Sequence, residues 1–521
     1  MNTNQKTITA VLAGVIFFVH TTSVAAPKPT ASTIATFVSS LFAAAPSVCP
    51  AAYTQLPNVP MVEYQGLSRL RASQLISNVT ASAIQQDQTL KTQPYLNLPL
   101  PDGSSLGTYN SPQQGVDLYR IHYRSTNVSG QDTLVSGLVA LPQESMSGGI
   151  IVYDHATQVS QQSGAPSAPS GEACIIVTAM AGKDRIVAMP DYLGFGINND
   201  IHPYPLGVMN VPAGQDMIIA ARELAQQIHP SETVGTNLYV TGYSEGGGNA
   251  LWLGRVLEQS AQTNMMPTLM APMSGNYDMT GAMAHSLIVN QPTKPIGMNA
   301  AITLLAKPVL LTFTAQAAWE IVARVSPASL LQPSMVSYDQ TNPLPVPYSG
   351  KAEIQAYVTG LSLTGYKLGY ANSSVNPSVL MQPSLVSDIQ TTNLSNPVIA
   401  LWGRNDNLNW RPKVPIYATG ILQDQIVPYA GSNYQPPASY TGGKPFFAQG
   451  NSQNLIKTMR ANGLNANQVA WCGIDAETIT TTAGKPQMIN HLTGLVPVSI
   501  LAARSIEAGT VAGMPALADP R

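Results

Sequence analysis

The chain has 521 residues and a formal net charge of −2, from 25 lysines and arginines against 27 aspartates and glutamates. This nearly neutral balance argues against nucleic-acid binding, which requires a basic face. The length exceeds that of one ordinary domain, so we expect one large domain with additions to it.

The first 26 residues predict a secretory signal peptide. Lys6 lies in a short polar head, and the apolar stretch from Ile8 to Val19 is too short to span a bilayer comfortably. Ser23-Val24-Ala25 then supplies small residues for cleavage. The mature chain is therefore expected to begin near Ala26 and to be secreted, either extracellular or periplasmic. An uncleaved anchor is the alternative, and the short apolar run disfavours it.

Residues 27–110 are rich in Ala, Ser, Pro and Gln, with only weak helical stretches. They predict an N-terminal extension that wraps the core. The chain has three cysteines, Cys49, Cys174 and Cys472. In an oxidising compartment they allow one disulfide and one free thiol, with three possible pairings. No spacing of Cys and His suggests a metal site, so no metal is expected.

Residues 111–273 alternate between strand-like and helix-like segments, which predicts a mostly parallel sheet with helices on both faces. The expected strands and one helix are, in chain order, a hairpin of 117–126 and 133–141, strands 150–154 and 186–190, helix 214–228, and a strand at 268–273.

One expected strand of this region begins at Gly148. It leads into the loop Asp154-His155-Ala156-Thr157. In hydrolases built on such a sheet, a loop at this place donates one backbone N–H to the oxyanion. Ala156 or Thr157 is the expected donor. His155 is expected to be structural because it precedes the nucleophile described next.

The segment Gly242-Tyr243-Ser244-Glu245-Gly246 lies between a β-prone stretch ending at Val240 and a helix-like run from Asn249 to Leu257. Glycines on both sides of Ser244 leave room for a tight strand-to-helix turn. This pattern is typical of the nucleophile elbow of the α/β-hydrolase fold. It predicts Ser244 as the nucleophile and the N–H of Glu245 as the second oxyanion donor.

A serine nucleophile needs a general base, and in this fold the base follows the serine and the acid in the chain. Of the seven histidines only His285 and His491 follow Ser244. His285 follows too closely to leave room for the remaining strands and the acid. His491 precedes the helix-like run 496–506, so it is the expected base.

Two aspartates compete for the role of the acid. Asp424 follows a strand-like stretch from Val414 and a turn, and Ile-Val-Pro comes soon after it. Asp406 follows a second strand-like stretch, residues 396–401, but sits in a polar turn that an Asx turn explains. The sequence favours Asp424.

Residues 274–394 interrupt the alternation and are rich in Met, Ala, Leu and Pro, with expected helices at 298–325 and 351–361. An insertion after the sixth strand of the fold would cover the strand ends where substrates bind, so a large helical cap or lid is predicted. Its apolar stripes fit internal packing or a lipid tunnel. The most apolar part, residues 300–323, is interrupted by Lys307, Pro308 and Glu320, so it predicts no membrane span. Residues 395–521 are expected to complete the core.

The chain resembles the secretory lipase family of α/β-hydrolases over roughly residues 110–510. The residues that carry the resemblance are His155-Ala156-Thr157, Ala165-Pro166-Ser167, Pro190-Asp191-Tyr192-Leu193-Gly194, His202-Pro203-Tyr204, Gly242-Tyr243-Ser244-Glu245-Gly246-Gly247, Ser274-Gly275-Asn276-Tyr277-Asp278, Trp410-Arg411-Pro412-Lys413-Val414-Pro415 and His491. The resemblance implies a secreted carboxylic-ester hydrolase, often acting on lipids, with Ser244, Asp424 and His491 as its triad. Ala156 stands where the family more often has glycine, and Gly164 where it often has cysteine.

The resulting prediction is a serine ester hydrolase, a lipase or carboxylesterase, that works through an acyl-enzyme and needs no cofactor. Its expected partners are small-molecule or lipid esters, with transient contact with a lipid interface and no nucleic acid. The alternatives are a short-chain or aromatic carboxylesterase rather than a true lipase, and a non-catalytic binding protein on a hydrolase scaffold.

Overall fold

The computed structural model describes residues 49, 54–56, 59–158, 166–168, 171–260, 262, 264–288, 310–311, 313–315, 317–322, 325–333, 378, 381–480, 484 and 486–519. The expected signal peptide at 1–26, the expected helix at 351–361 and most of the expected helix at 298–325 lie outside these residues.

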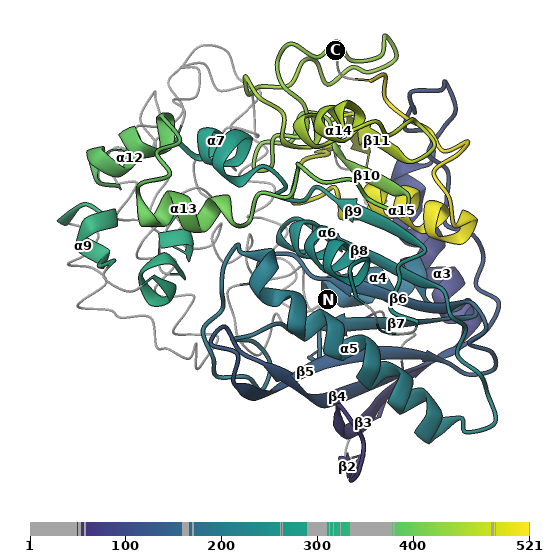
Figure 1. Cartoon of the computed structure of the whole chain (residues 1–521). Coiled ribbons are helices and arrows are strands. Elements are labelled where there is room, and N and C mark those ends of the chain that lie inside the picture. The colour runs from purple at the N-terminus through teal and green to yellow at the C-terminus, as the bar shows by residue number, and fades with distance from the viewer. Residues whose placement is uncertain are drawn as a thin grey trace, which may run out of the picture.

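An 11-stranded sheet runs through the centre of the molecule (Figure 1). Its order is β1-β3-β4-β5-β7-β6-β8-β9-β10-β11, and β2 also pairs with β3. Strands β7, β6, β8, β9, β10 and β11 are parallel to their neighbours, whereas β3, β4 and β5 join them antiparallel. The bounds are β1 Thr54–Gln55, β2 Val62–Glu63, β3 Leu70–Val79, β4 Val116–Thr126, β5 Asp132–Pro142, β6 Gly149–Asp154, β7 Arg185–Pro190, β8 Leu238–Tyr243, β9 Leu269–Met273, β10 Ile416–Ile421 and β11 Val469–Ile474.

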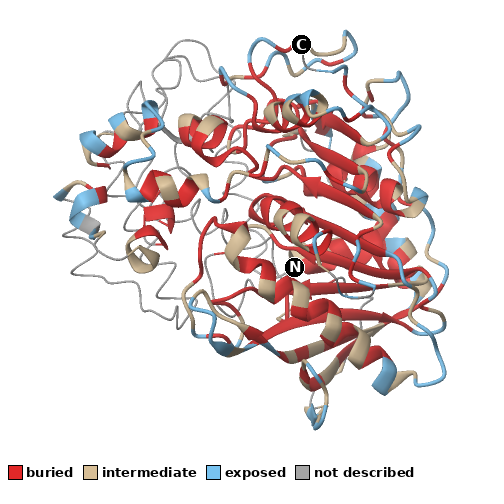
Figure 2. Ribbon diagram, viewed as in Figure 1, coloured by how far each residue is buried: buried red, intermediate tan, exposed pale blue. Residues whose placement is uncertain are grey.

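The central parallel strands are buried along their whole length, as Figure 2 shows. A parallel sheet needs helices on both faces to bury strands of this kind. Apolar side chains of α5 (Gly207–Ile228) and α6 (Glu245–Leu257) pack on one face, and α14 (Asn451–Ala461) continues that layer. The opposite face carries α3 (Ala81–Thr92), α4 (Gly171–Met180) and α15 (Leu495–Ala508).

The structure confirms the strands expected at 117–126, 133–141, 150–154, 186–190 and 268–273, and the helix expected at 496–506. It also places a further helix and strand, α14 and β11, between Asp424 and His491. Helix α5 begins at Gly207 rather than at Gly214, because its first turns pack closely against Asn249 of α6.

One expectation about local structure is incomplete and another is wrong. Residues 27–110 were expected to form an extension with weak helical stretches; α3 is such a helix, but β3 in the same range is a ten-residue strand of the sheet itself. The strand expected at 396–401 is helix α13 (Pro397–Gly403). There the Asn396 side chain accepts from the Val398 N–H and Pro397 is the first helical residue, which are strong helix-start signals for a short apolar run.

Short helices α7 (Ala284–Ile288), α9 (Pro327–Leu330), α12 (Pro383–Gln390) and α13 lie together beside the sheet (Figure 1). Apolar residues from this region form a separate hydrophobic cluster around Trp402 and Phe313. The cap over 274–394 remains a prediction, because much of that range lies outside the described residues. No helix in the described part of the chain is long and apolar enough to cross a bilayer.

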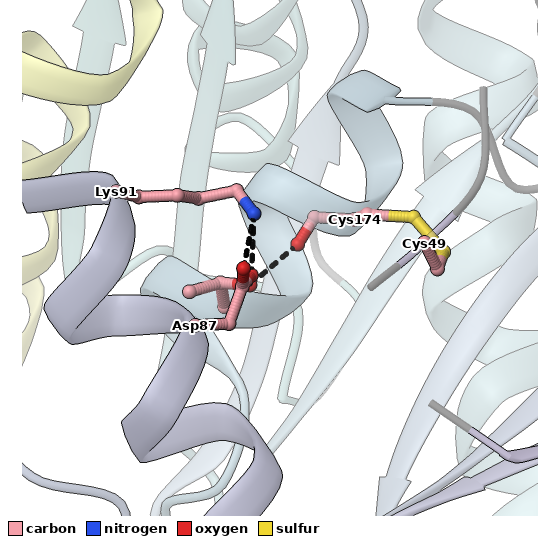
Figure 3. The surroundings of a disulfide bond; sticks show 5 residues. Cys49, Asp87, Lys91 and Cys174 are labelled. Atoms are coloured by element: carbon pink, nitrogen blue, oxygen red, sulfur yellow. Dashed lines mark hydrogen bonds and ion pairs between the residues drawn. A yellow bond between two sulfur atoms is a disulfide. The ribbon is translucent and has the colours of Figure 1, made fainter. Parts of the chain in front are cut away.

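Cys49 and Cys174 form a disulfide with a Cα–Cα distance of 5.4 Å (Figure 3). Cys472 is a free, buried thiol. The bond joins the N-terminal segment to α4, which also contacts α3 through a hydrogen bond from the Gln88 amide to the Thr178 carbonyl at 2.9 Å. Of the three possible pairings, the structure contains this one.

Replacing Cys174 with serine is expected to lower the free energy of unfolding by about 2–5 kcal/mol. The bond closes a loop with a sequence separation of 125 residues, and cross-links across long loops constrain the unfolded chain most. Denaturant unfolding of the oxidised protein and of Cys174→Ser measures the difference. Adding a thiol reductant should destabilise the wild type and leave the variant unchanged; an equal response of both proteins would contradict the prediction.

Candidate functional site

Ser244 sits at the sharp turn between β8 and α6. Its backbone has φ 58° and ψ −119°, a left-handed conformation that is strained for a residue with a side chain. A Cβ on Gly246 would lie 1.9 Å from the Asp154 carbonyl oxygen, and one on Gly242 would lie 2.3 Å from the Gly246 oxygen. Both flanking glycines are therefore required for this turn to close against β6.

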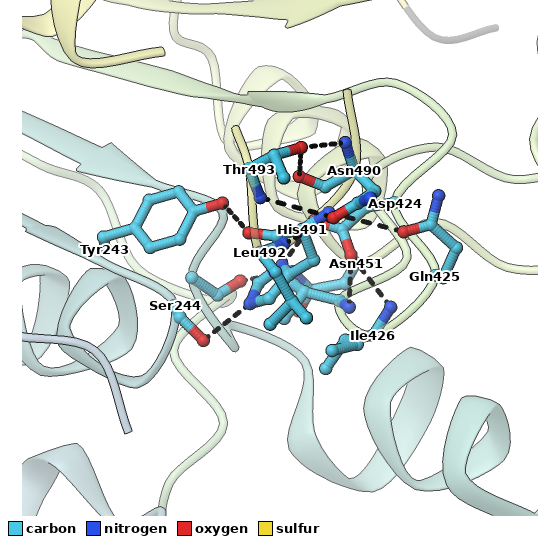
Figure 4. Close-up of polar contacts among 12 residues, drawn as sticks. Tyr243, Ser244, Asp424, Gln425, Ile426, Asn451, Asn490, His491, Leu492 and Thr493 are labelled. Carbon is cyan, nitrogen blue, oxygen red and sulfur yellow. Dashed lines mark hydrogen bonds and ion pairs between the residues drawn. The ribbon is translucent and has the colours of Figure 1, made fainter. Parts of the chain in front are cut away.

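Three side chains form a continuous chain of hydrogen bonds at the turn (Figure 4). The Ser244 Oγ lies 2.8 Å from His491 Nε2. His491 Nδ1 lies 2.7 Å from Asp424 Oδ2. All three side chains are buried. The structure therefore brings together the three residues expected to be nucleophile, base and acid.

The loop after β10 fixes the Asp424 carboxylate through the oxygen that does not contact His491. Asp424 Oδ1 accepts the N–H groups of Ile426 at 2.9 Å and Val427 at 2.8 Å, so Oδ2 is left to face the imidazole. The competing aspartate, Asp406, is elsewhere and accepts the Thr280 N–H at 3.0 Å. Of the two candidates for the acid, only Asp424 contacts His491.

Two neighbours of His491 were not expected from the sequence. The Tyr243 ring stacks on the imidazole at 5.3 Å, and its hydroxyl donates to the His491 carbonyl. The Gln425 side-chain oxygen accepts the His491 N–H at 3.3 Å. Both residues adjoin a triad member in sequence, which is the signal that could have suggested them. They fix the backbone and the ring plane of the base.

The loop after β6 begins against Gly246 of the elbow and carries the expected oxyanion donors, but one of them is already engaged. The Ala156 N–H donates to Glu172 Oε1 at 2.7 Å. Thr157 is therefore the better candidate of the two. The Glu245 N–H is the first amide of α6, and the first amides of a helix have no acceptor within it. It can therefore point towards a developing oxyanion.

His155 does not reach the triad. Its Nε2 lies 3.1 Å from the Asp191 carbonyl, and its ring stacks on Tyr192 at 4.0 Å. These contacts fit the structural role expected for it, which is to join the loops after β6 and β7.

A pocket of about 460 Å³, its open mouth included, adjoins Ser244. Its walls are mainly apolar, with polar atoms from a few side chains. The lining residues are Tyr204, Pro205, Ser244, Glu245, Asn276, Met279, Met283, Leu310, Thr314, Ile426 and Val427. Five of them, from Asn276 to Thr314, fall within the range 274–394, so described residues of this range form part of the wall.

Asp154, at the end of β6, is a buried carboxyl beside the elbow. Burial raises its pKa well above the usual range, and the nearby Glu245 carboxyl raises it further. Among the described residues its Oδ2 has no hydrogen-bond partner. Asp154 therefore holds its proton to higher pH than a carboxyl in water does.

The raised pKa of Asp154 predicts a loss of stability as the pH rises. In the unfolded chain the group ionises above about pH 4, whereas the folded protein keeps the proton. Unfolding therefore becomes easier with rising pH, by up to about 1.4 kcal/mol per pH unit. Asp154→Asn is expected to remove this slope, measured as the fall in the free energy of unfolding between pH 5 and pH 8. Glu232→Gln, at an exposed glutamate, should keep the wild-type slope; the same slope in Asp154→Asn would refute the assignment.

Within the part of the chain that the structure describes, no group of three or more His, Cys, Asp or Glu residues could hold a metal ion.

The fold is similar to solved structures of hydrolases. A rice cell wall degrading esterase, LipA from Xanthomonas oryzae, has a TM-score of 0.60 at 20% identity, covering 84% of this chain and 98% of that one. A protein from Legionella pneumophila assigned as a hydrolase has a TM-score of 0.60 at 18% identity, covering 85% and 98%. Candida antarctica lipase A in its closed state is similar over 78% of this chain and 82% of its own, with a TM-score of 0.49 at 15% identity. No protein-family model and no curated protein matches the chain. The first two likenesses confirm the α/β-hydrolase fold.

Proposed function

Starting from an α/β-hydrolase fold with a buried serine at its elbow, we propose that the protein is a serine carboxylic-ester hydrolase. The observation that carries the proposal is the unbroken contact from Ser244 through His491 to Asp424 beside an apolar pocket. Groups in this order are the arrangement that activates a serine hydroxyl. The resemblance of the sequence to secretory lipases points to the same chemistry.

In the proposed reaction the Ser244 Oγ attacks the ester carbonyl carbon while His491 Nε2 accepts its proton. Asp424 accepts the Nδ1–H of His491, so it fixes the tautomer and stabilises the imidazolium that forms. The imidazolium then gives its proton to the departing alkoxide, and an acyl-enzyme remains. Water, deprotonated by His491, attacks the acyl carbon. The imidazolium then returns this proton to Ser244 Oγ as the bond between Oγ and the acyl carbon breaks, which releases the carboxylic acid.

Negative charge develops on the carbonyl oxygen in both tetrahedral intermediates, so donors must already point at it. We assign the Glu245 N–H as the first donor and the Thr157 N–H as the second, in place of Ala156. The amide of Ala156 is held by Glu172 instead, and that contact orients the loop that carries Thr157.

The pocket supports an ester with an apolar acyl or alcohol group. Met279, Met283 and Leu310 line it on the side of the insertion, and Ile426 and Val427 line it beside the acid. Both a lipase and a short-chain or aromatic carboxylesterase fit these walls. A transient contact with a lipid interface belongs to the lipase form of the proposal, and LipA of Xanthomonas oryzae is an esterase of the same fold.

We also propose that the protein is secreted. The N-terminal sequence has the form of a signal peptide, and the Cys49–Cys174 disulfide suits an oxidising compartment.

The test is labelling with a fluorophosphonate probe together with hydrolysis of p-nitrophenyl esters of graded acyl length. An active serine hydrolase is expected to be labelled and to show a preferred chain length. Activation by emulsified substrate above its solubility would identify the lipase form. A folded protein that neither reacts with the probe nor cleaves any ester of the series would instead support the non-catalytic binding protein.

A further inference from the structure

A buried histidine and a buried glutamate are in contact beside the nucleophile. His202 Nε2 lies 2.9 Å from Glu245 Oε1, and the two side chains are only 2% and 1% exposed. Glu245 follows Ser244 and is the first residue of α6. His202 comes from the loop between β7 and α5. The proposed reaction uses the Glu245 amide but gives neither side chain a role.

Burial makes this contact indispensable to both groups. An ionised carboxylate removed from water is strongly disfavoured unless a partner compensates its charge. Among the described residues, neither His202 Nε2 nor either carboxyl oxygen of Glu245 has a hydrogen-bond partner, because the 2.9 Å contact between them is not aligned as a hydrogen bond. The ion-pair contact is therefore the polar interaction that each side chain has there.

The other ring nitrogen anchors His202 to its loop. His202 Nδ1 lies 3.1 Å from the Leu193 carbonyl oxygen. A carbonyl only accepts, so Nδ1 carries a hydrogen and donates it. The imidazole is therefore held at Nδ1, and its Nε2 edge stays 2.9 Å from the Glu245 carboxyl.

We infer that the contact between His202 and the Glu245 side chain positions the Glu245 amide as an oxyanion donor. This positioning role rests on the proposed ester hydrolysis.

The titratable groups around the pair are buried groups that ionise less readily than usual. Asp154 lies near it at the end of β6, and burial raises its pKa. The phenols of Tyr192 and Tyr204 face the same carboxyl, and burial likewise raises the pKa of each. The Phe195 ring meets the imidazole edge-on at 4.7 Å. These neighbours surround the pair without supplying a competing charge.

The Glu245 side chain and the proposed oxyanion donor, the Glu245 N–H, belong to the same residue at the start of α6. The first amides of a helix have no acceptor within the helix. A side chain tied to His202 therefore limits how far the first turn of α6 can rotate. Oxyanion donors act only when aligned to within about 0.5 Å, and losing one costs about 10²–10³-fold in kcat. A loosened donor should cost part of this factor.

His202→Asn removes the contact with Glu245 while keeping a donor to the Leu193 carbonyl. The asparagine amide can replace Nδ1 and donate to the Leu193 carbonyl, but it is too short to reach Glu245. Glu245→Gln removes the charge from the other side at nearly constant volume. His229→Asn is the matched control, because His229 caps the C-terminal end of α5. Thermal unfolding identifies any variant that fails to fold. If one of the two pair variants fails, the other still tests the inference.

For His202→Asn and for Glu245→Gln we expect kcat on p-nitrophenyl butyrate to fall about 10–100-fold, with KM within about twofold. The double variant should fall no further than the worse single one, because both remove the same contact. His229→Asn should keep the wild-type kcat. An unchanged kcat, or a loss carried by KM alone, in both folded single variants overturns the positioning role.

If the wild type cleaves no ester, the proposed function and the positioning role fail together. If the wild type is active, its rate supports the proposed function, and kcat of the two pair variants alone decides the positioning role.

Discussion

Replacing Ser244 with alanine is expected to lower kcat for p-nitrophenyl esters by at least about 10⁴-fold and to abolish fluorophosphonate labelling. The Oγ is the atom that forms the acyl-enzyme, and the imidazole at 2.8 Å has no second hydroxyl to activate. Removing a serine nucleophile typically leaves only the small residual rate that binding and the oxyanion donors supply. Initial rates with purified protein, corrected for spontaneous hydrolysis, measure the loss.

The fold should survive this substitution, because the strained backbone at φ 58° then carries only a smaller side chain. Ser147→Ala is the matched control. Ser147 is exposed and precedes β6, which runs parallel to β8, so it lies at the opposite edge of the sheet from Ser244. Wild-type rates in Ser244→Ala would rule out the assigned nucleophile, whatever the other variants show.

Asp424→Asn is expected to lower kcat by about 10⁴-fold while KM changes little. An amide nitrogen placed opposite His491 Nδ1 would favour the tautomer with its proton on Nε2, which cannot accept from Ser244. The loop should keep its form, because the asparagine oxygen can still accept the Ile426 and Val427 amides. The readout is kcat and KM at several pH values, with the melting temperature as a check on folding.

Asp406→Asn is the control that the chain itself offers. Asp406 was the rival candidate for the acid, and its carboxylate binds Thr280 rather than the base. It should retain activity within a few-fold of the wild type. If Asp406→Asn lost more activity than Asp424→Asn, the acid would have been assigned to the wrong loop.

The elbow was predictable because its requirements are local. Gly242 and Gly246 are needed within a few residues of Ser244, and a strand and a helix adjoin them, so a short segment carries the whole signal. His491 could be found by elimination, since only two histidines follow the serine. The strands of the parallel core were equally visible, because burial on both faces makes each of them a continuous apolar run.

The expectations that failed concern segments whose structure depends on contacts elsewhere in the fold. The segment 396–401 was expected to be a strand, and a short apolar run does not distinguish a strand from a helix. The Asn396 cap and Pro397 decide it, together with packing of the helix into the cluster around Trp402. Strand β3 was missed because its sequence, LRASQLISNV, mixes polar and apolar residues. Pairing with β4 stabilises β3 as a strand, although its own sequence favours a strand only weakly.

The sequence alone therefore determined the fold class and pointed to the proposed nucleophile and base, because these depend on order and spacing along the chain. The sequence favoured Asp424 over Asp406, but only the tertiary structure showed that Asp424 contacts His491, and which of the three cysteine pairings is present. It also showed that Glu172 holds the Ala156 amide and that His202 meets Glu245. Each of these is a contact between residues that the chain brings together from different loops, and such contacts are set by where the sheet places the ends of its strands.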